Sequence, residues 1–133
     1  MIKVLLADDN ESMRAVMRRL LSRDPRIKII GEAHSFATTM RAIADFRPEV
    51  LLLDLHLPES RNFSPEFVRS QLGSVPCTLA VSFSNDSEAK SLAKSYGASA
   101  LLDKMKLYND MIPAILVCAN MCHARFRCNL GPA

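Results

Sequence analysis

The chain has 133 residues, a length that accommodates one domain with a sizeable core and leaves little room for a second. Hydrophobic residues make up 49% and charged residues 23% of the sequence, proportions that are typical of globular proteins and argue against disorder. The net charge of only +3 argues against a concentrated basic surface, so we expect no direct binding of nucleic acid.

Short apolar segments alternate with amphipathic stretches along the chain, a pattern that predicts strands and helices around a parallel sheet. Three of the apolar segments are nearly continuous, as expected for strands that are buried on both faces. The predicted fold class is therefore α/β. The predicted strands are Lys3–Ala7, Ile27–Ala33, Val50–Leu53, Cys77–Val81 and Ser99–Leu102.

Helices are predicted between these strands, because apolar residues recur there at spacings of three and four. Capping residues, prolines and glycines bound each of them. The first predicted helix carries apolar residues from Met13 to Leu21 and is stopped by Asp24-Pro25, and the second runs from a Ser35 cap and ends before Arg47-Pro48. The third opens at Ser64-Pro65 and is closed by Gly73, and the fourth runs from near Asn85 to Gly97.

The fifth helix is predicted to begin at Asn109, because this start places Pro113 in the first turn, where its missing N–H costs little. The run from Met111 to Cys122 carries more apolar residues than one core-facing stripe requires, so we expect an exposed patch that contacts a partner or a second copy. The pattern ends near Ala124. We therefore predict a domain over residues 1–124 and a poorly ordered tail over 125–133.

The N-terminus lacks the regions of a secretory signal. The longest apolar run has 12 residues, well below the roughly 20 that a bilayer-spanning helix needs. We therefore expect a cytoplasmic protein without membrane contact.

Four cysteines follow no disulfide-framework spacing, and a reducing cytosol predicts free thiols at Cys77, Cys118, Cys122 and Cys128. An alternative is a metal site at Cys118, Cys122, His123 and Cys128. The paired Cys-x2-Cys spacing of structural zinc is missing there, which argues against this alternative.

Polar residues follow four of the five predicted strands: Asp8 and Asp9, then Asp54, Ser82 and Lys104. Open parallel sheets bind ligands at the carboxyl ends of their strands. Three carboxylates at one sheet edge would repel one another and raise one another's pKa values, so a cation is expected among them. Mg2+ or Mn2+ suits oxygen ligands, and a nucleophilic carboxylate beside such an ion and a lysine suits phosphoryl transfer.

The motif made of Asp8-Asp9, Asp54-Leu55-His56-Leu57-Pro58, Ser82 and Lys104 resembles the receiver domains of response regulators. The resemblance extends over about residues 1–122. It implies a doubly wound, flavodoxin-like fold in which five helices flank a five-stranded parallel sheet of order 2-1-3-4-5.

The resemblance also implies the role of each acidic residue. Asp54 corresponds to the phosphoacceptor. Asp9 corresponds to a direct metal ligand, Asp8 to the residue that holds a water ligand of the metal, and the backbone carbonyl of His56 to the remaining protein ligand.

Lys104 and Ser82 correspond to the residues that bind phosphoryl oxygens and report phosphorylation. By the same resemblance the phosphoryl donor is a sensor histidine kinase or a phosphotransfer protein. The surface made by the fourth helix, fifth strand and fifth helix would change on phosphorylation and is the expected site of a homodimer. The chain is thus expected to be a signalling phosphoacceptor, with no enzymatic activity beyond its own phosphorylation and dephosphorylation.

Three residues depart from the family pattern. Phe83 stands where a small residue is usual and is expected to narrow the path to Asp54, which would slow phosphoryl entry and hydrolysis. Leu101 replaces the usual aromatic switch residue, and Met105 replaces the proline that commonly follows the lysine. These departures keep open a second hypothesis, a degenerate receiver that binds proteins without being phosphorylated.

Two enzyme classes are less consistent with the sequence. Phosphatases with an aspartate nucleophile carry a second aspartate two residues later, where this chain has His56. Nucleotide-binding folds carry glycine-rich phosphate loops, and neither Gly-x-Gly-x-x-Gly nor Gly-Lys-Ser/Thr occurs here.

Overall fold

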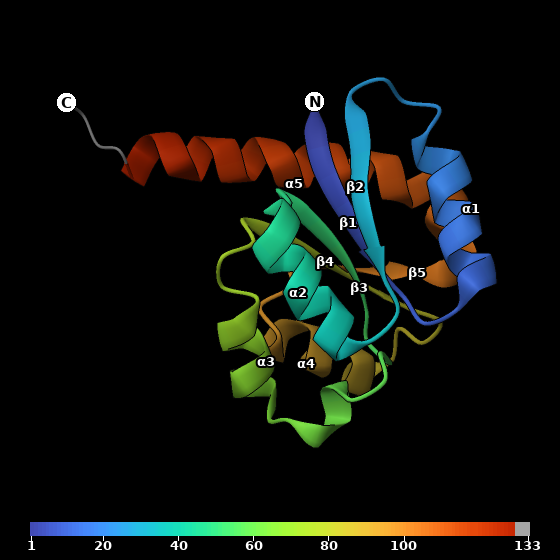
Figure 1. Cartoon of the computed structure of the whole chain (residues 1–133), viewed down its shortest axis with the longest axis vertical. Coiled ribbons are helices and arrows are strands. Elements are labelled where there is room, and N and C mark those ends of the chain that lie inside the picture. The colour runs from blue at the N-terminus through green and yellow to red at the C-terminus, as the bar shows by residue number, and fades with distance from the viewer. Residues whose placement is uncertain (130–133) are drawn as a thin grey trace.

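The computed structural model describes the backbone of residues 1–129 and the side chains of residues 1–121. Within these residues, five parallel strands form one sheet in the order β2-β1-β3-β4-β5 (Figure 1). The strands are β1 (Ile2–Ala7), β2 (Ile27–Ala33), β3 (Val50–Asp54), β4 (Cys77–Ser82) and β5 (Ala100–Asp103).

Helices cover both faces of the sheet (Figure 1). One face packs against α1 and α5, and the other packs against α2, α3 and α4. The helices are α1 (Glu11–Leu21), α2 (Phe36–Phe46), α3 (Pro65–Gln71), α4 (Ser87–Ser95) and α5 (Leu107–Asn129), with short 3-10 helices η1 (Ser60–Asn62) and η2 (Lys104–Lys106). The predicted doubly wound α/β fold and its strand order are confirmed.

Side-chain caps fix where four of the helices begin. Asn10, Ser35, Ser64 and Asp86 each accept a hydrogen bond from a backbone N–H in the first turn of the helix that follows. Such a bond satisfies a donor that has no partner within the helix. After α4, Gly97 adopts a φ of 81°, a left-handed conformation that glycine reaches without steric cost, and the chain turns into β5.

The central strand β3 is buried along its whole length, as its unbroken apolar sequence predicts. Its neighbour β1 alternates, so that Val4 and Leu6 face α1 and α5 while Leu5 and Ala7 face the other helical layer. Because β1 and β3 are parallel neighbours packed between two apolar layers, their carboxyl ends lie together at one edge of the sheet.

The helix α5 differs from its predicted limits. It begins at Leu107, directly after η2, so Pro113 lies in its second turn and not in its first. Pro113 is exposed, which places the lost backbone hydrogen bond where water can replace it. The helix continues to Asn129, so the boundary predicted at Ala124 falls inside it, and residues 130–133 lie outside the described residues.

Across residues 1–129, every helix is too short or too polar to cross a membrane.

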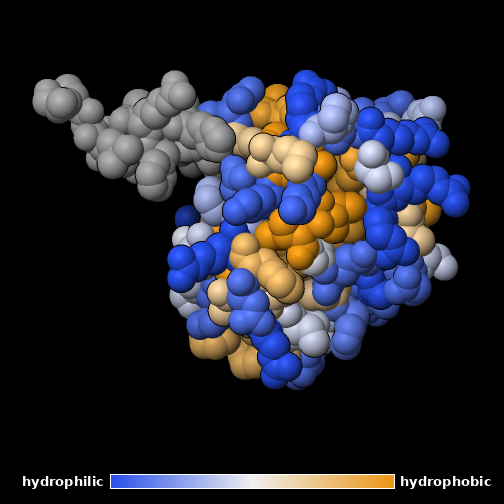
Figure 2. Space-filling model, turned by 45° about the horizontal axis from the view of Figure 1, so that its top comes forward, coloured by the Kyte–Doolittle hydropathy of each residue, from blue (hydrophilic) through white to orange (hydrophobic). Residues whose placement is uncertain are grey.

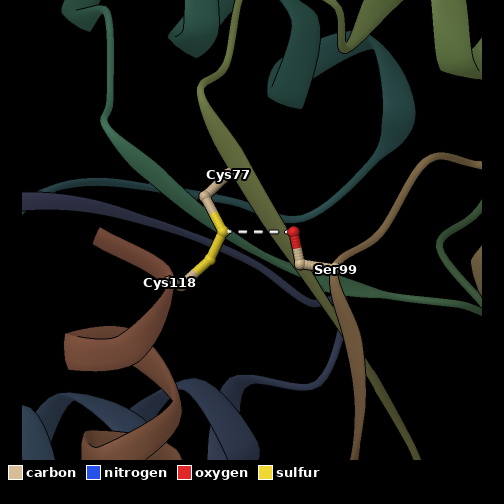
Figure 3. The surroundings of a disulfide bond; sticks show 3 residues. All are labelled: Cys77, Ser99 and Cys118. Carbon is tan, nitrogen blue, oxygen red and sulfur yellow. Dashed lines mark hydrogen bonds between the residues drawn. A yellow bond between two sulfur atoms is a disulfide. The ribbon is translucent and has the colours of Figure 1, made fainter. Parts of the chain in front are cut away.

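The prediction of free thiols is wrong for one pair of cysteines. Cys77 at the start of β4 and Cys118 in α5 form a disulfide, with Cα atoms 6.1 Å apart, and Ser99 Oγ lies 3.4 Å from Cys77 Sγ (Figure 3). Both cysteines are buried. Spacing rules miss this pair, because its members are 41 residues apart and meet only when α5 packs on β4.

The disulfide also removes Cys118 from the alternative metal site. The remaining members, Cys122, His123 and Cys128, have side chains outside the described residues.

The edge strand β2 carries a close contact with α2. A Cβ atom on Gly31 would lie 3.0 Å from two carbons of the Phe46 ring, closer than ordinary packing, so a larger residue there would have to displace the ring. Phe46 stays half exposed, and Figure 2 shows apolar surface on the side of the molecule where α2 and β2 lie.

Candidate functional site

Three carboxylates meet at the carboxyl edge of the sheet. Asp8 follows β1 directly, Asp54 ends β3, and the two strands are neighbours. One oxygen from each of Asp8, Asp9 and Asp54 lies within 4.8 Å of the others. Asp8 and Asp54 are buried, with 1% and 3% of their surface exposed, whereas Asp9 is exposed. The structure therefore brings together the acidic residues that the sequence predicted to converge.

The side chain of Lys104 reaches this cluster from η2, just after β5. Its ammonium nitrogen lies 2.8 Å from Asp8 Oδ2 and 3.4 Å from Asp54 Oδ2, and only 6% of the side chain is exposed. One ammonium cannot balance three ionised carboxylates, so the cluster keeps an excess of negative charge when all three are ionised. This excess favours a divalent cation.

Burial is the main influence on the ionisation of Asp54. It raises the pKa of that carboxyl above its ordinary value, and the nearby charge of Asp8 raises it further. The backbone N–H of His56, which donates to Asp54 Oδ1 over 3.0 Å, and the ammonium of Lys104 act in the opposite direction. The pKa of Asp54 is raised overall, so the site disfavours the ionised form of this carboxyl.

The donor set of the cluster fits Mg2+ or Mn2+, because all of its side-chain donors are carboxylate oxygens. Asp8 Oδ1 accepts a hydrogen bond from the backbone N–H of Asn10 over 2.8 Å. Asp8 Oδ2 is buried and accepts no hydrogen bond from the described residues, since its contact with Lys104 is an ion pair without hydrogen-bond geometry. Asp8 Oδ2 thus keeps a lone pair that can bind a metal ion or a water ligand of that ion.

The residue after the β4 core, Ser82, is fully buried beside the acidic cluster. The register pairs Asp54 with Val81, so Ser82 lies one position beyond the end of β3. Its hydroxyl oxygen accepts a hydrogen bond from the backbone N–H of Ser84 over 3.0 Å, which holds the turn between β4 and α4.

Two of the three departures from the family pattern are Phe83, which follows Ser82 in the chain, and Leu101, which lies in β5. Phe83 is 59% exposed, and its ring centre lies 5.1 Å from the ammonium nitrogen of Lys104, a cation–π contact. Leu101 is partly buried and packs into the apolar cluster under α4. In that cluster lies Tyr96, an aromatic residue that is 4% exposed.

A groove of about 530 Å³ lies beside the site, between the loop after β3 and the helix α4. His56 and Tyr96 line it, together with Arg61, whose Nη2 lies 3.1 Å from His56 Nδ1. Neither Arg61 nor Tyr96 belongs to the site that the sequence predicts. No spacing rule identifies either residue, because both reach the groove through tertiary packing.

Comparison with known proteins assigns a family. Residues 4–115 match the response regulator receiver domain. Over 107 residues the chain is 36% identical to the DNA-binding transcriptional activator DevR/DosR of Mycobacterium tuberculosis, an alignment that covers 78% of this chain and 48% of that protein. It is 30% identical over 108 residues to a protein-glutamate methylesterase/protein-glutamine glutaminase of Syntrophus aciditrophicus, covering 78% of this chain and 30% of the relative.

Solved structures agree with this assignment. The signal receiver domain of the response regulator NarL from Mycobacterium tuberculosis superposes with a TM-score of 0.78 at 25% identity, covering 90% of this chain and 96% of that one. The response regulator domain of Thermotoga maritima CheB shares the fold, with a TM-score of 0.77 at 19% identity over 90% of this chain and 97% of that one. The chain spans less than half the length of the two curated relatives described above. It belongs to the response regulator receiver domain family.

Proposed function

We propose that Asp54 is the phosphoacceptor of this receiver domain and that a magnesium ion held by Asp8, Asp9, Asp54 and the backbone carbonyl of His56 is needed for the transfer. The observation that carries the proposal is the position of the Asp54 carboxylate, buried between two other acids and 3.4 Å from the Lys104 ammonium. A magnesium or manganese ion, when bound, supplies positive charge for the phosphoryl oxygens.

The proposed transfer takes a phosphoryl group from a phosphohistidine of a histidine kinase or a phosphotransfer protein. A carboxylate oxygen of Asp54 attacks phosphorus, the N–P bond of the donor breaks, and its electron pair stays with the imidazole. The product is an acyl phosphate on Asp54. Hydrolysis reverses the modification: water attacks phosphorus, the P–O bond to Asp54 breaks, and phosphate leaves while the carboxylate is regenerated.

Lys104 is suited to hold the transferred group. Its ammonium already spans Asp8 and Asp54, so a short movement brings it to a phosphoryl oxygen. The ion pair with Asp54 weakens once that carboxylate is phosphorylated, because its own charge is lost, and the ammonium is then free to pair with the phosphoryl oxygens.

Ser82 is suited to report the modification. Its hydroxyl oxygen accepts the N–H of Ser84, and a rotation that carries this oxygen toward a phosphoryl oxygen would break that bond. The turn before α4 then loses the hydrogen bond that holds it. Because Leu101 lacks an aromatic ring, we propose that Tyr96, buried in the same apolar cluster, takes part in the response of α4.

The proposed output is a protein contact made by the surface of α4, β5 and α5. Among the described residues, Met105, Tyr108, Val117 and Met121 of η2 and α5 are large apolar side chains that are at least half exposed. Val117 and Met121 lie four residues apart on one face of α5, as the excess of apolar residues in that helix predicted. A second copy of the chain is the proposed partner, and a mass that stays monomeric with a phosphoryl analogue at high concentration would contradict it.

The phosphoacceptor is tested by incubating the protein with a small phosphoryl donor, such as acetyl phosphate, and magnesium before measuring its intact mass. We expect wild type to gain one phosphoryl group, and Asp54→Asn or wild type in a chelator to gain none. A gain that survives Asp54→Asn places the modification elsewhere. No gain in wild type supports the degenerate receiver, whose partner binding should then be unchanged by Asp54→Asn.

A further inference from the structure

Arg14 occupies an unusual position for a charged residue of a surface helix. It lies in the first turns of α1, and only 13% of its side chain is exposed. Its guanidinium binds three groups at once: Nη1 donates to the backbone carbonyl of Asp8, Nη2 donates to the Glu11 carboxylate, and Nε donates to Glu32 Oε1 over 3.2 Å. Since Glu32 belongs to β2, the side chain ties α1, the end of β1 and β2 together.

Of these three interactions, the hydrogen bond from Arg14 to the backbone carbonyl of Asp8 reaches the acidic cluster. The Asp8 carboxylate is held through Asn10 and Lys104. Among the described residues, by contrast, none holds the Asp9 carboxylate with a hydrogen bond or an ion pair. The direction of the Asp9 side chain therefore depends on its backbone, and the peptide between Asp8 and Asp9 is the part that Arg14 fixes.

A guanidinium suits this task better than an ammonium. Its donors are arranged in a rigid planar fork, so one side chain can bind a carbonyl and two carboxylates in fixed directions. The two glutamates also balance its charge, which lets it approach the acidic cluster without contributing a free positive charge.

We propose that Arg14 is a positioning residue for the metal site, acting by fixing the peptide that joins Asp8 to Asp9 so that the two carboxylates face one ion. This inference rests on the proposed magnesium site.

Arg18 offers a matched control on the same helix. It lies one turn further along α1 and pairs with the same acids, at 2.7 Å from Glu32 Oε2 and 3.6 Å from Glu11 Oε1. It makes no hydrogen bond or ion pair with Asp8 among the described residues. Removing either arginine also removes a positive charge near the acids, which by itself should tighten the binding of a divalent cation. Weaker binding in an Arg14 variant therefore reports lost positioning and not changed charge.

The test is the dissociation constant of Mg2+, measured by isothermal titration calorimetry on wild type, Arg14→Gln, Arg14→Lys and Arg18→Gln. We expect Arg14→Gln to weaken binding about tenfold, as is common when a group that orients a metal ligand is lost. Arg14→Lys, which keeps the charge but not the fork, should also be weaker than wild type. Arg18→Gln should bind within about twofold of wild type or more tightly. Unchanged binding in Arg14→Gln, or equal weakening in Arg18→Gln, overturns the inference.

A second measurement separates this inference from the proposed metal site. In metal-free protein, Arg14→Gln should shift the backbone amide resonances of Asp9 and Asn10, while Arg18→Gln leaves them in place. If wild type binds no Mg2+, the proposed metal site fails, but these amide shifts still test Arg14. If Arg14→Gln does not fold, both measurements are made on Arg14→Lys. Amide resonances and an Mg2+ affinity that both match wild type in Arg14→Lys would contradict the positioning role of Arg14.

Discussion

The ammonium nitrogen of Lys104 lies 5.1 Å from the centre of the Phe83 ring, so the residue that follows Ser82 covers the cation that pairs with Asp54. The ring is 59% exposed, with Lys104 on its inner side. A cation–π contact of this kind is worth about 0.5–1 kcal/mol at an exposed site. Lys104 must therefore loosen this contact as well as its ion pairs if it moves to a phosphoryl group.

Truncating the Phe83 side chain should speed the phosphorylation and dephosphorylation of Asp54. Phe83→Ala removes both the bulk and the π face, and we expect phosphorylation by acetyl phosphate and the subsequent dephosphorylation to accelerate about two- to fivefold, the factor that corresponds to the contact energy. The rates can be followed by intact mass. Phe83→Leu keeps bulk without the π face: rates like wild type indicate a steric effect, and rates like Phe83→Ala indicate the cation–π contact. Wild-type rates in Phe83→Ala would contradict both.

Much of the site could be predicted from the sequence because the fold constrains it. Parallel strands place their carboxyl ends at one edge, so Asp8, Asp54 and Lys104 converge once the strands are recognised. Arg14 could not be predicted in the same way. Its role depends on a long side chain that crosses from α1 to β2, and α-helical periodicity marks only which residues face the core.

The disulfide escaped prediction for a related reason. Cys77 lies in β4 and Cys118 lies in α5, and the two elements pack against each other in the core. The two sulfur atoms meet only through this packing, which cysteine spacing along the chain does not reveal. The start of α5 was misplaced because η2 continues directly into it, so Pro113 is accommodated inside the helix on an exposed side.

Neutralising Asp54 should stabilise the metal-free protein at neutral pH. Because the folded protein raises the pKa of Asp54, the stability linked to its protonation is present below the unfolded pKa and is lost as the pH rises through the folded value. Asp54→Asn should therefore melt a few degrees above wild type at pH 7 in a chelator, and the difference should vanish at a pH below about 4.

Thermal melts with and without magnesium check this expectation. Asp9→Asn is the control, because it removes a similar charge at an exposed position and should shift the melting temperature less. Magnesium should raise the melting temperature of wild type by mass action and narrow the gap to Asp54→Asn. A lower melting temperature in Asp54→Asn than in wild type at pH 7 would contradict the destabilising effect of its buried charge.

The Cys77–Cys118 disulfide should contribute about 2–4 kcal/mol to the free energy of unfolding, because it closes a long loop. Urea denaturation should show this loss for Cys118→Ala relative to oxidised wild type, and a reductant should bring wild type close to the variant. Alkylation after unfolding without reductant should label two fewer cysteines than alkylation after reduction. Equal labelling would show that the bond is absent.

The hydroxyl of Ser82 should be dispensable for phosphorylation and necessary for its effect on α4. Ser82→Ala leaves the N–H of Ser84 without its acceptor, at a cost of about 1 kcal/mol in stability, but it leaves Asp54 and Lys104 intact. We expect the phosphoryl gain in intact mass to persist, while the amide shifts that beryllofluoride causes in α4 become smaller. Ser84→Ala removes a neighbouring hydroxyl and keeps the Ser82 oxygen, so its α4 shifts should match wild type. Full α4 shifts in Ser82→Ala would show that another group carries the signal, with Tyr96, buried in the cluster beneath α4, the next residue to substitute.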